Sequence, residues 1–180
     1  MKKLTKTLAI AAIAVSATAA QAQLYGEIGY SALKISGQAP IGKVEASPKM
    51  IGLTVGYGVL NNVAVEAMLG LNAGDDAAKA DGEATNGKMK IERAFGLFVK
   101  PRAMLGANVE VFGRFGYART TANTTTPDAS NSADNNGFAY GLGANYYFNA
   151  KTYLSVNYMS FSNKDEGKID GFTFGLGMKF

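Results

Sequence analysis

Eight stretches of this chain alternate between large apolar residues and small or polar ones. The clearest is the last, where Phe172, Phe174, Leu176, Met178 and Phe180 occupy every second position and Gly, Thr or Lys the others. A period of two is that of a β-strand, whose successive side chains point to opposite faces. The same period predicts strands at 24–35, 50–57, 63–71, 88–99, 108–119, 137–148, 152–161 and 171–180.

The predicted connections alternate in length. Long polar loops are expected at 36–48, 72–87 and 120–136, and an intermediate one at 163–168. Short turns are expected after the second, fourth and sixth strands, the middle one beginning at Lys100-Pro101-Arg102. Long loops on one side, short turns on the other and strands of about ten residues are typical of a barrel that crosses an outer membrane.

The residues on the second face of each predicted strand, opposite its apolar face, distinguish such a barrel from a secreted β-sandwich. A sandwich would present Lys, Glu and Thr to water there, whereas this chain places many glycines on that side: Gly52, Gly56, Gly116, Gly141, Gly143, Gly175 and Gly177. Aromatic residues also gather near strand ends, as in the interfacial girdles of membrane barrels. We therefore predict an all-β fold, an eight-stranded antiparallel up-and-down transmembrane β-barrel, closed by pairing the last strand with Tyr25–Ser31.

The first 22 residues have the features of a secretory signal peptide. Lys2, Lys3 and Lys6 precede an apolar run from Leu8 to Val15, and Ala20-Gln21-Ala22 has the small-x-small pattern of a cleavage site. The apolar run is too short to span a bilayer, which takes about 20 residues. The expected organisation is a signal peptide at 1–22 and a barrel domain at 23–180.

Composition narrows the chemistry. The chain has no Cys and no His, so neither disulfides nor Ser-His-Asp, Cys-His or His-metal sites can form. Its net charge of +4 falls to +1 without the leader lysines, and the remaining charges are interspersed. A nucleic-acid partner is therefore not expected, and no cofactor or catalytic site is predicted.

The leader, the alternating strands and the ending Phe-Thr-Phe-Gly-Leu-Gly-Met-Lys-Phe180 resemble the small eight-stranded outer-membrane barrels, of the opacity-type, OmpX/Ail-like superfamily of Gram-negative bacteria. The resemblance implies location in the outer membrane, with its lipids and lipopolysaccharide as partners. It also implies contact with periplasmic chaperones and the outer-membrane assembly machinery, which reads the terminal aromatic strand. Phe180 would carry that signal, with Phe174, Leu176 and Met178 in support. Related barrels that modify lipid A use a catalytic His, which this chain lacks.

Two groups of charged residues invite a chemical interpretation. Glu27, Glu66, Glu110 and Arg114 fall in mid-strand on the small-residue face. They could form a carboxylate-based site, but an ion network filling the barrel interior is the favoured interpretation, because unpaired buried charge is very costly. Asp75, Asp76, Asp81 and Glu83 could bind Ca²⁺, but their spacing does not match an EF-hand and favours a solvated acidic loop.

These observations favour a non-enzymatic outer-membrane barrel with a structural or adhesive role, whose surface loops contact an external ligand. A narrow porin-like channel for small solutes is the alternative, since many interior glycines could leave a gap. A soluble secreted binding module is a third class.

Overall fold

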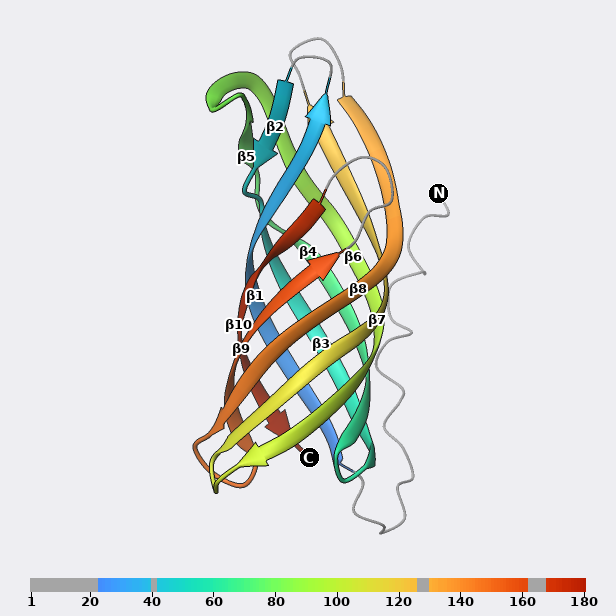
Figure 1. The fold of residues 1–180 in the computed structure, drawn as a ribbon, viewed down its shortest axis with the longest axis vertical. Helices are drawn as coiled ribbons and strands as arrows, with labels where there is room; N and C mark the ends of the chain where they lie inside the picture. Colours follow the sequence, from blue (N-terminus) through green and yellow to red (C-terminus); the bar gives the residue numbers. More distant parts are fainter. Residues whose placement is uncertain (1–22, 40–41, 126–129, 162–167) are drawn as a thin grey trace, which may run out of the picture.

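The alternating segments lie side by side in one antiparallel sheet that closes on itself (Figure 1). The computed structural model describes residues 23–39, 42–125, 130–161 and 168–180. Its strands are β1 (Gln23–Ala39), β2 (Gly42–Ala46), β3 (Lys49–Leu60), β4 (Val63–Gly74), β5 (Asp76–Ala80), β6 (Glu83–Leu105), β7 (Val109–Thr125), β8 (Ser130–Tyr147), β9 (Thr152–Phe161) and β10 (Lys168–Lys179). The predicted signal peptide lies outside the described residues.

Eight of these strands form the barrel wall, in the order β1-β3-β4-β6-β7-β8-β9-β10. The barrel closes where β10 pairs with β1, from Tyr25 opposite Lys179 to Ser36 opposite Lys168. This confirms the predicted pairing of the last strand with Tyr25–Ser31. Closure gives each of the eight wall strands a partner on both sides, which a sheet in hydrocarbon requires.

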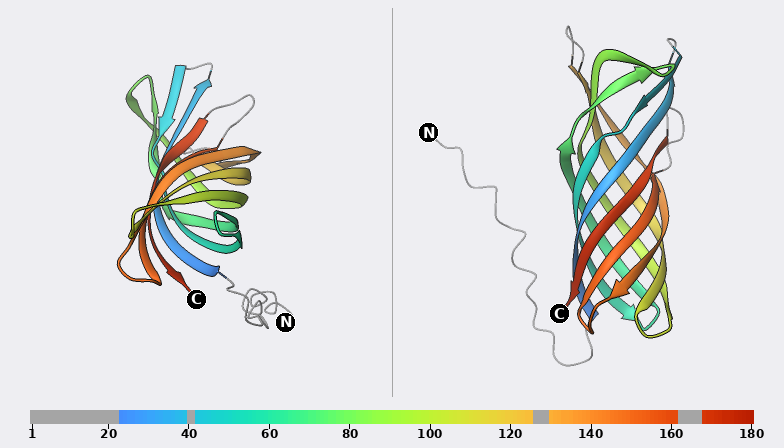
Figure 2. Two further views of the ribbon diagram at one scale, coloured as in Figure 1. Left: turned by 60° about the horizontal axis from the view of Figure 1, so that its bottom comes forward. Right: turned by 90° about the vertical axis from the view of Figure 1, so that its left-hand side faces the viewer.

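The two ends of the barrel differ, as Figure 2 shows. The turn end carries Gln23, Phe180 and the short connections at 61–62, 106–108 and 148–151. At the ribbon end, paired strands rise beyond the wall. We call them the β1–β2 ribbon (35–46), the β5–β6 ribbon (76–89) and the β7–β8 ribbon (119–136).

The ribbons correct the sequence prediction, which placed loops at 36–48, 72–87 and 120–136. Most of those residues are paired strand. The period-two signal is missing there because most ribbon residues are partly or well exposed, so neither face of a ribbon has to be apolar. The predicted loop at 163–168 lies outside the described residues except for Lys168, which begins β10.

The predicted turn at Lys100-Pro101-Arg102 is also wrong. Strand β6 continues to Leu105, and the turn lies at 106–108, where Gly106 has a φ of +75°. Proline has no N–H for the strand ladder. The β6–β7 pairing therefore skips Lys100 and Pro101 and resumes at Arg102, opposite Phe112.

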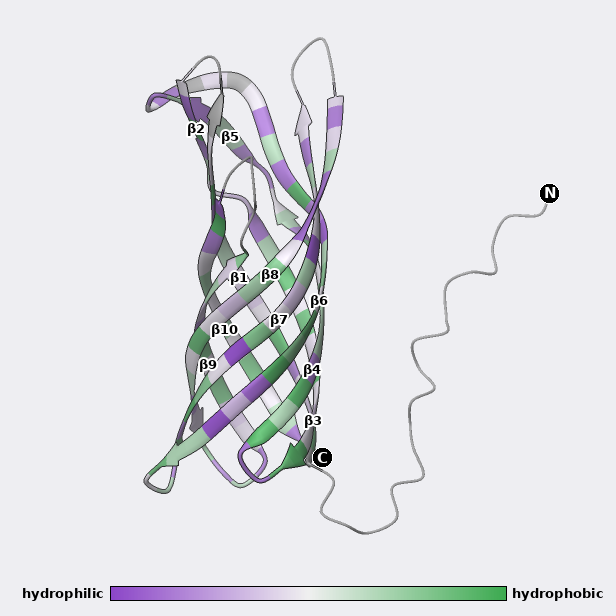
Figure 3. Ribbon diagram, turned by 45° about the vertical axis from the view of Figure 1, so that its right-hand side comes forward, coloured by the Kyte–Doolittle hydropathy of each residue, from purple (hydrophilic) through white to green (hydrophobic). Residues whose placement is uncertain are grey.

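Figure 3 shows hydrophobic and polar residues in alternation along the wall and mostly polar residues in the ribbons. The large apolar residues of the wall are the exposed ones, so its outer face is apolar. Leu142, Phe174 and Leu176 expose more than half of their surface, as do many other large apolar residues of the wall. Ile91 has the same period-two position as the outward-facing Phe95, which predicts an outward side chain, but Ile91 is fully buried. A β-bulge between Ile91 and Arg93 shifts the register there, and a one-residue shift turns a side chain to the opposite face.

Candidate functional site

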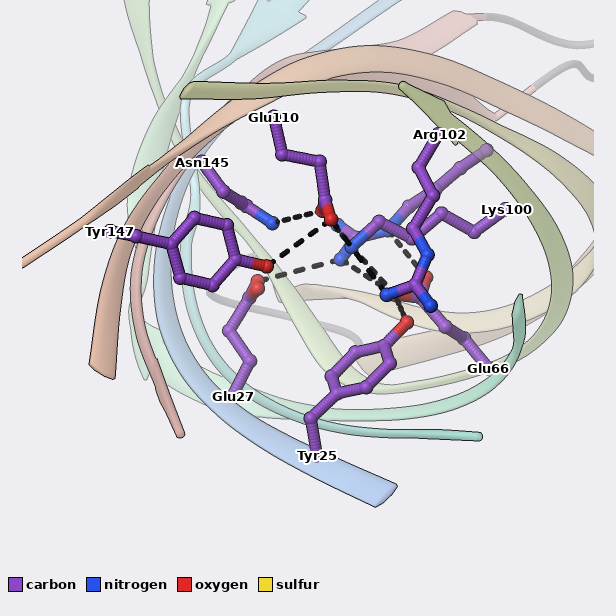
Figure 4. A network of polar contacts seen from close by, with 9 residues as sticks. Tyr25, Glu27, Glu66, Lys100, Arg102, Glu110, Asn145 and Tyr147 are labelled. Carbon is purple, nitrogen blue, oxygen red and sulfur yellow. Dashed lines mark hydrogen bonds and ion pairs between the residues drawn. The ribbon is translucent and has the colours of Figure 1, made fainter. Parts of the chain in front are cut away.

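Six charged side chains meet inside the barrel near the turn end (Figure 4). Glu27 comes from β1, Glu66 from β4, Glu110 and Arg114 from β7, and the other two from β6. Each is at most 8% exposed. These positions alternate along each strand with the apolar positions that face lipid. Their side chains therefore point inward, as those of the small residues do.

Glu66 is the centre of one half of this network. Its carboxylate accepts a hydrogen bond from the Tyr25 hydroxyl at 2.6 Å and another from Arg114 Nε at 2.6 Å. Arg114 Nη2 lies 3.5 Å from Glu27 Oε1 and so joins two acids on different strands. Charge-assisted bonds of this length are the strong ones in proteins.

Glu110 is the centre of the other half. It accepts hydrogen bonds from Asn145 Nδ2 at 2.8 Å and from the Tyr147 hydroxyl at 3.2 Å, and Arg102 Nη1 lies 3.7 Å away. Lys100 joins the two halves, because its ammonium lies 3.4 Å from Glu66 and 3.6 Å from Glu110. The Lys100 ammonium also lies 4.1 Å from the centre of the Phe112 ring, a cation–π contact.

The network is electrically balanced, with three carboxylates against three cations. A buried ion pair must offset the desolvation of both partners, and only good geometry and further hydrogen bonds achieve this. The donors from Tyr25, Asn145 and Tyr147 supply those bonds. The arrangement therefore fills and cross-links the interior and leaves Glu66 and Glu110 engaged with cations.

The structure places the four sequence-predicted charges together in the interior. Sequence reasoning missed Lys100 and Arg102, which it assigned to a turn. The two-residue period could have revealed them. Every second residue of β6 from Gly96 onward faces inward, and this series comprises Gly96, Phe98, Lys100 and Arg102.

A second, apolar layer fills the lumen toward the ribbon end. Along β1, Leu33 lies six residues beyond Glu27 and belongs to a buried cluster with Met50, Phe98 and Phe161. Its other fully buried members are Ile91, Ala94, Ala118, Ala139, Met159 and Ile169. Between the two layers, Glu27, Arg114 and Met159 line a cavity of about 20 Å³, room for about one water molecule. The lumen is thus filled by side chains at two levels.

The interior glycines accommodate large neighbouring side chains. A Cβ at Gly56 would overlap the ring of Tyr25, and one at Gly177 would overlap the ring of Tyr153. At these two positions the space beside the glycine is therefore occupied by a tyrosine ring.

Three acidic residues of the predicted loop at 72–87 accept hydrogen bonds from different partners. Asp76 accepts a hydrogen bond from the backbone N–H of Ser47, and Asp81 accepts one from that of Lys43. Asp75 accepts from the Asn72 side chain. Within the described residues no group of three acidic side chains is placed to hold a metal ion.

The predicted assembly residues Phe174, Leu176, Met178 and Phe180 all face outward on or just after β10, each about half exposed or more. The backbone N–H of Phe180 donates to Leu24 O at 2.9 Å, which extends the closure of the barrel to the last residue.

A closed eight-stranded antiparallel barrel with an apolar outer wall and an interior filled by side chains defines an integral outer-membrane barrel. Residues 6–180 match the family model described as outer membrane protein beta-barrel domain, and the chain belongs to this family. The protein accordingly resides in the outer membrane.

Solved structures share the fold. Ail, the attachment invasion locus protein of Yersinia pestis, aligns with a TM-score of 0.61 and 17% identity over 88% of this chain and 99% of Ail. Neisserial surface protein A aligns with a TM-score of 0.66 and 14% identity over 87% and 97% of the two chains. OprG of Pseudomonas aeruginosa aligns with a TM-score of 0.61 and 16% identity over 88% and 96%. No curated protein sequence matches the chain significantly.

Proposed function

We propose that this protein is a non-conducting, non-enzymatic barrel that anchors an interaction surface outside the cell. The observation that carries the proposal is the contrast between the two halves of the molecule. The lumen is closed by a charge network and an apolar layer, whereas the three ribbons extend polar, paired strands beyond the wall. The barrel then serves as a membrane anchor, and the ribbons meet the external ligand.

The ribbons are suited to this role because they are held in place. The β1–β2 and β5–β6 ribbons pair with each other through Val44 and Ala80. On the β7–β8 ribbon, Asp134 accepts from the Thr121 hydroxyl and pairs with Arg119 at 2.7 Å. The Thr121 hydroxyl and the Arg119 guanidinium hold the pKa of Asp134 below its usual range. Ordered strands lose less entropy on binding than free loops do.

An external ligand is supported by one relative. Ail has been solved in complex with the heparin analogue sucrose octasulfate. Heparin is therefore a reasonable first probe for a ligand of this chain. Periplasmic chaperones and the outer-membrane assembly machinery remain proposed partners on the way to the membrane.

Trimming the β7–β8 ribbon should separate anchoring from binding. Ala122 pairs with Ala133, so Asn-Gly in place of residues 123–132 would close the ribbon with a two-residue turn. We expect the trimmed protein to keep its heat-modifiable migration in detergent gels, because the apolar wall and charge network are untouched. Cells displaying it should bind immobilised heparin less than cells displaying the full chain. Unchanged binding after each ribbon is trimmed in turn would contradict the proposal.

The alternative, a narrow channel for small solutes, predicts a different electrical result. The two filled levels of the lumen leave a cavity of only about 20 Å³ between them. We expect the purified, folded protein to give no sustained single-channel steps in planar bilayers. Reproducible steps would favour the channel and overturn the sealed-lumen interpretation.

A further inference from the structure

The small cavity between the charge network and the apolar layer is lined by buried polar atoms that have no partner. Glu27 and Asn157 both line it and are only 3% and 2% exposed. Glu27 Oε2, Asn157 Nδ2 and Asn157 Oδ1 make no hydrogen bond within the part of the chain that the structure describes. We propose that the cavity is a binding site for one ordered water molecule, which joins Glu27 to Asn157. The proposal is independent of what the ribbons bind.

The strand register directs the two side chains toward the same level of the lumen. Strand β10 separates β1 from β9. On β10, Gly177 pairs with Glu27 of β1, and Thr173 pairs with Asn157 of β9. Gly175 lies between these two positions, and a Cβ there would lie 3.1 Å from both Cγ and Oε1 of Glu27. The Glu27 carboxylate therefore extends over Gly175, along the barrel toward the level of Asn157.

The lining of the cavity offers a water molecule both donors and acceptors. Asn157 Nδ2 can donate to it, and Glu27 Oε2 can accept from it. Ser31 and Thr173 also line the cavity, and their hydroxyls, 2.8 Å apart, keep further lone pairs. Buried waters typically make about three hydrogen bonds, a number these groups can supply. Since both polar atoms of Asn157 lack a partner, the conclusion holds for either orientation of the amide.

Charge and volume distinguish water from other occupants. The network already balances three carboxylates with three cations, so a buried metal ion would add an uncompensated charge. A metal ion also could not accept a hydrogen bond from Asn157 Nδ2. A dry cavity would leave a buried carboxylate oxygen of Glu27 without any hydrogen bond, which is costly. A neutral molecule that donates and accepts satisfies all of these atoms, and a volume of about 20 Å³ admits only one the size of water.

Replacing Gly52 with Ala tests the proposal through the sign of a stability change. Gly52 lines the cavity, and a Cβ there would meet only Leu69 O, at 3.7 Å. The methyl group therefore enters the cavity without a clash and displaces a bound water, which leaves Glu27 and Asn157 unpaired. We expect the folded-to-unfolded ratio to fall at least about fivefold, measured by denaturant titration of protein folded in lipid vesicles. In a dry cavity the same methyl group would fill unused space and raise the ratio.

Two further variants control for effects of the side chain itself. Gly26→Ala makes the same change on the outer face of β1, where a Cβ would meet only the Phe180 ring, at 3.7 Å. It measures the effect that Gly→Ala has through the unfolded chain, and the fall in Gly52→Ala is counted from it. Gly52→Ser should stay within about twofold of the unmodified protein, because its hydroxyl donates and accepts in place of the water. A smaller fall or a rise in Gly52→Ala would overturn the proposal, and so would an equal loss in Gly52→Ser.

Nuclear magnetic resonance of the protein in nanodiscs detects the water directly. The side-chain amide protons of Asn157 should show NOE and ROE cross-peaks of opposite sign to the water resonance, which distinguishes a bound water from proton exchange. These cross-peaks should vanish in Gly52→Ala, and their absence from the unmodified protein would overturn the proposal. Exchanging sodium chloride for choline chloride at equal ionic strength should leave the stability unchanged. A loss of stability on removing sodium would show a cation in the site and would also overturn the proposal.

Discussion

Replacing Arg114 with Met should destabilise the barrel by about 3–5 kcal/mol, because it leaves three buried carboxylates with only two cations. Arg114 joins Glu66 at 2.6 Å and Glu27 at 3.5 Å, and all three side chains are buried. The free energy of unfolding would be measured by denaturant titration of the protein folded in lipid vesicles. The variant should also unfold at a lower temperature in heat-modifiability gels.

Two further variants show whether unpaired charge is the cause. Arg114→Met with Glu66→Gln should recover part of the lost stability, since the amide still accepts the Tyr25 hydrogen bond without a buried charge. Lys168→Met removes an exposed cation that pairs with Asp170, and it should change little. If the double variant were less stable than Arg114→Met alone, packing by Arg114 rather than its charge would explain the loss.

The barrel wall could be predicted from the sequence because lipid imposes a strict pattern on it. Each outward position must be apolar, so a strand such as 171–180 shows its period directly. The ribbons have no such constraint, and 120–136 therefore looks like a loop although most of it is paired strand. The bulge at Ile91 was hidden for a related reason: it changes the register without changing the composition.

The charged site could be predicted in part. Four of its residues could be identified because each is a charged residue in the middle of a strand with clear alternation: Glu27, Glu66, Glu110 and Arg114. Lys100 and Arg102 flank Pro101, and proline usually ends a strand. In β6 the proline is tolerated because the β6–β7 pairing is interrupted at Lys100 and Pro101. The next backbone N–H, that of Arg102, donates to Asn62 O. A count of the predicted interior charges would have indicated further cations, because three buried acids require more than one buried cation.

The layered interior also shows how side chains fill a barrel that has so many glycines. A glycine on one strand leaves space that a large side chain on a neighbouring strand fills, as Tyr25 does at Gly56 and Met159 does at Gly141. Composition alone cannot distinguish a glycine that opens a pore from one that accommodates a ring. The difference depends on register, because the filling residue must lie beside the glycine on the adjacent strand.

Changing Phe180 to Ala should sharply reduce the amount of folded barrel in the outer membrane while leaving the stability of the folded protein nearly unchanged. Phe180 is 66% exposed, so packing of its side chain contributes little, and its backbone N–H bond to Leu24 survives the change. A large effect would therefore have to come from recognition of the terminal strand during assembly. Folded protein in outer-membrane fractions is measured by heat-modifiable migration, and stability by denaturant titration in vesicles.

Phe148→Ala removes another exposed ring at the turn end, and Lys179→Ala alters the adjacent residue; both should assemble well. Assembly of the Phe180 variant at the level of these controls would show that Phe180 is an interfacial residue without a signalling role.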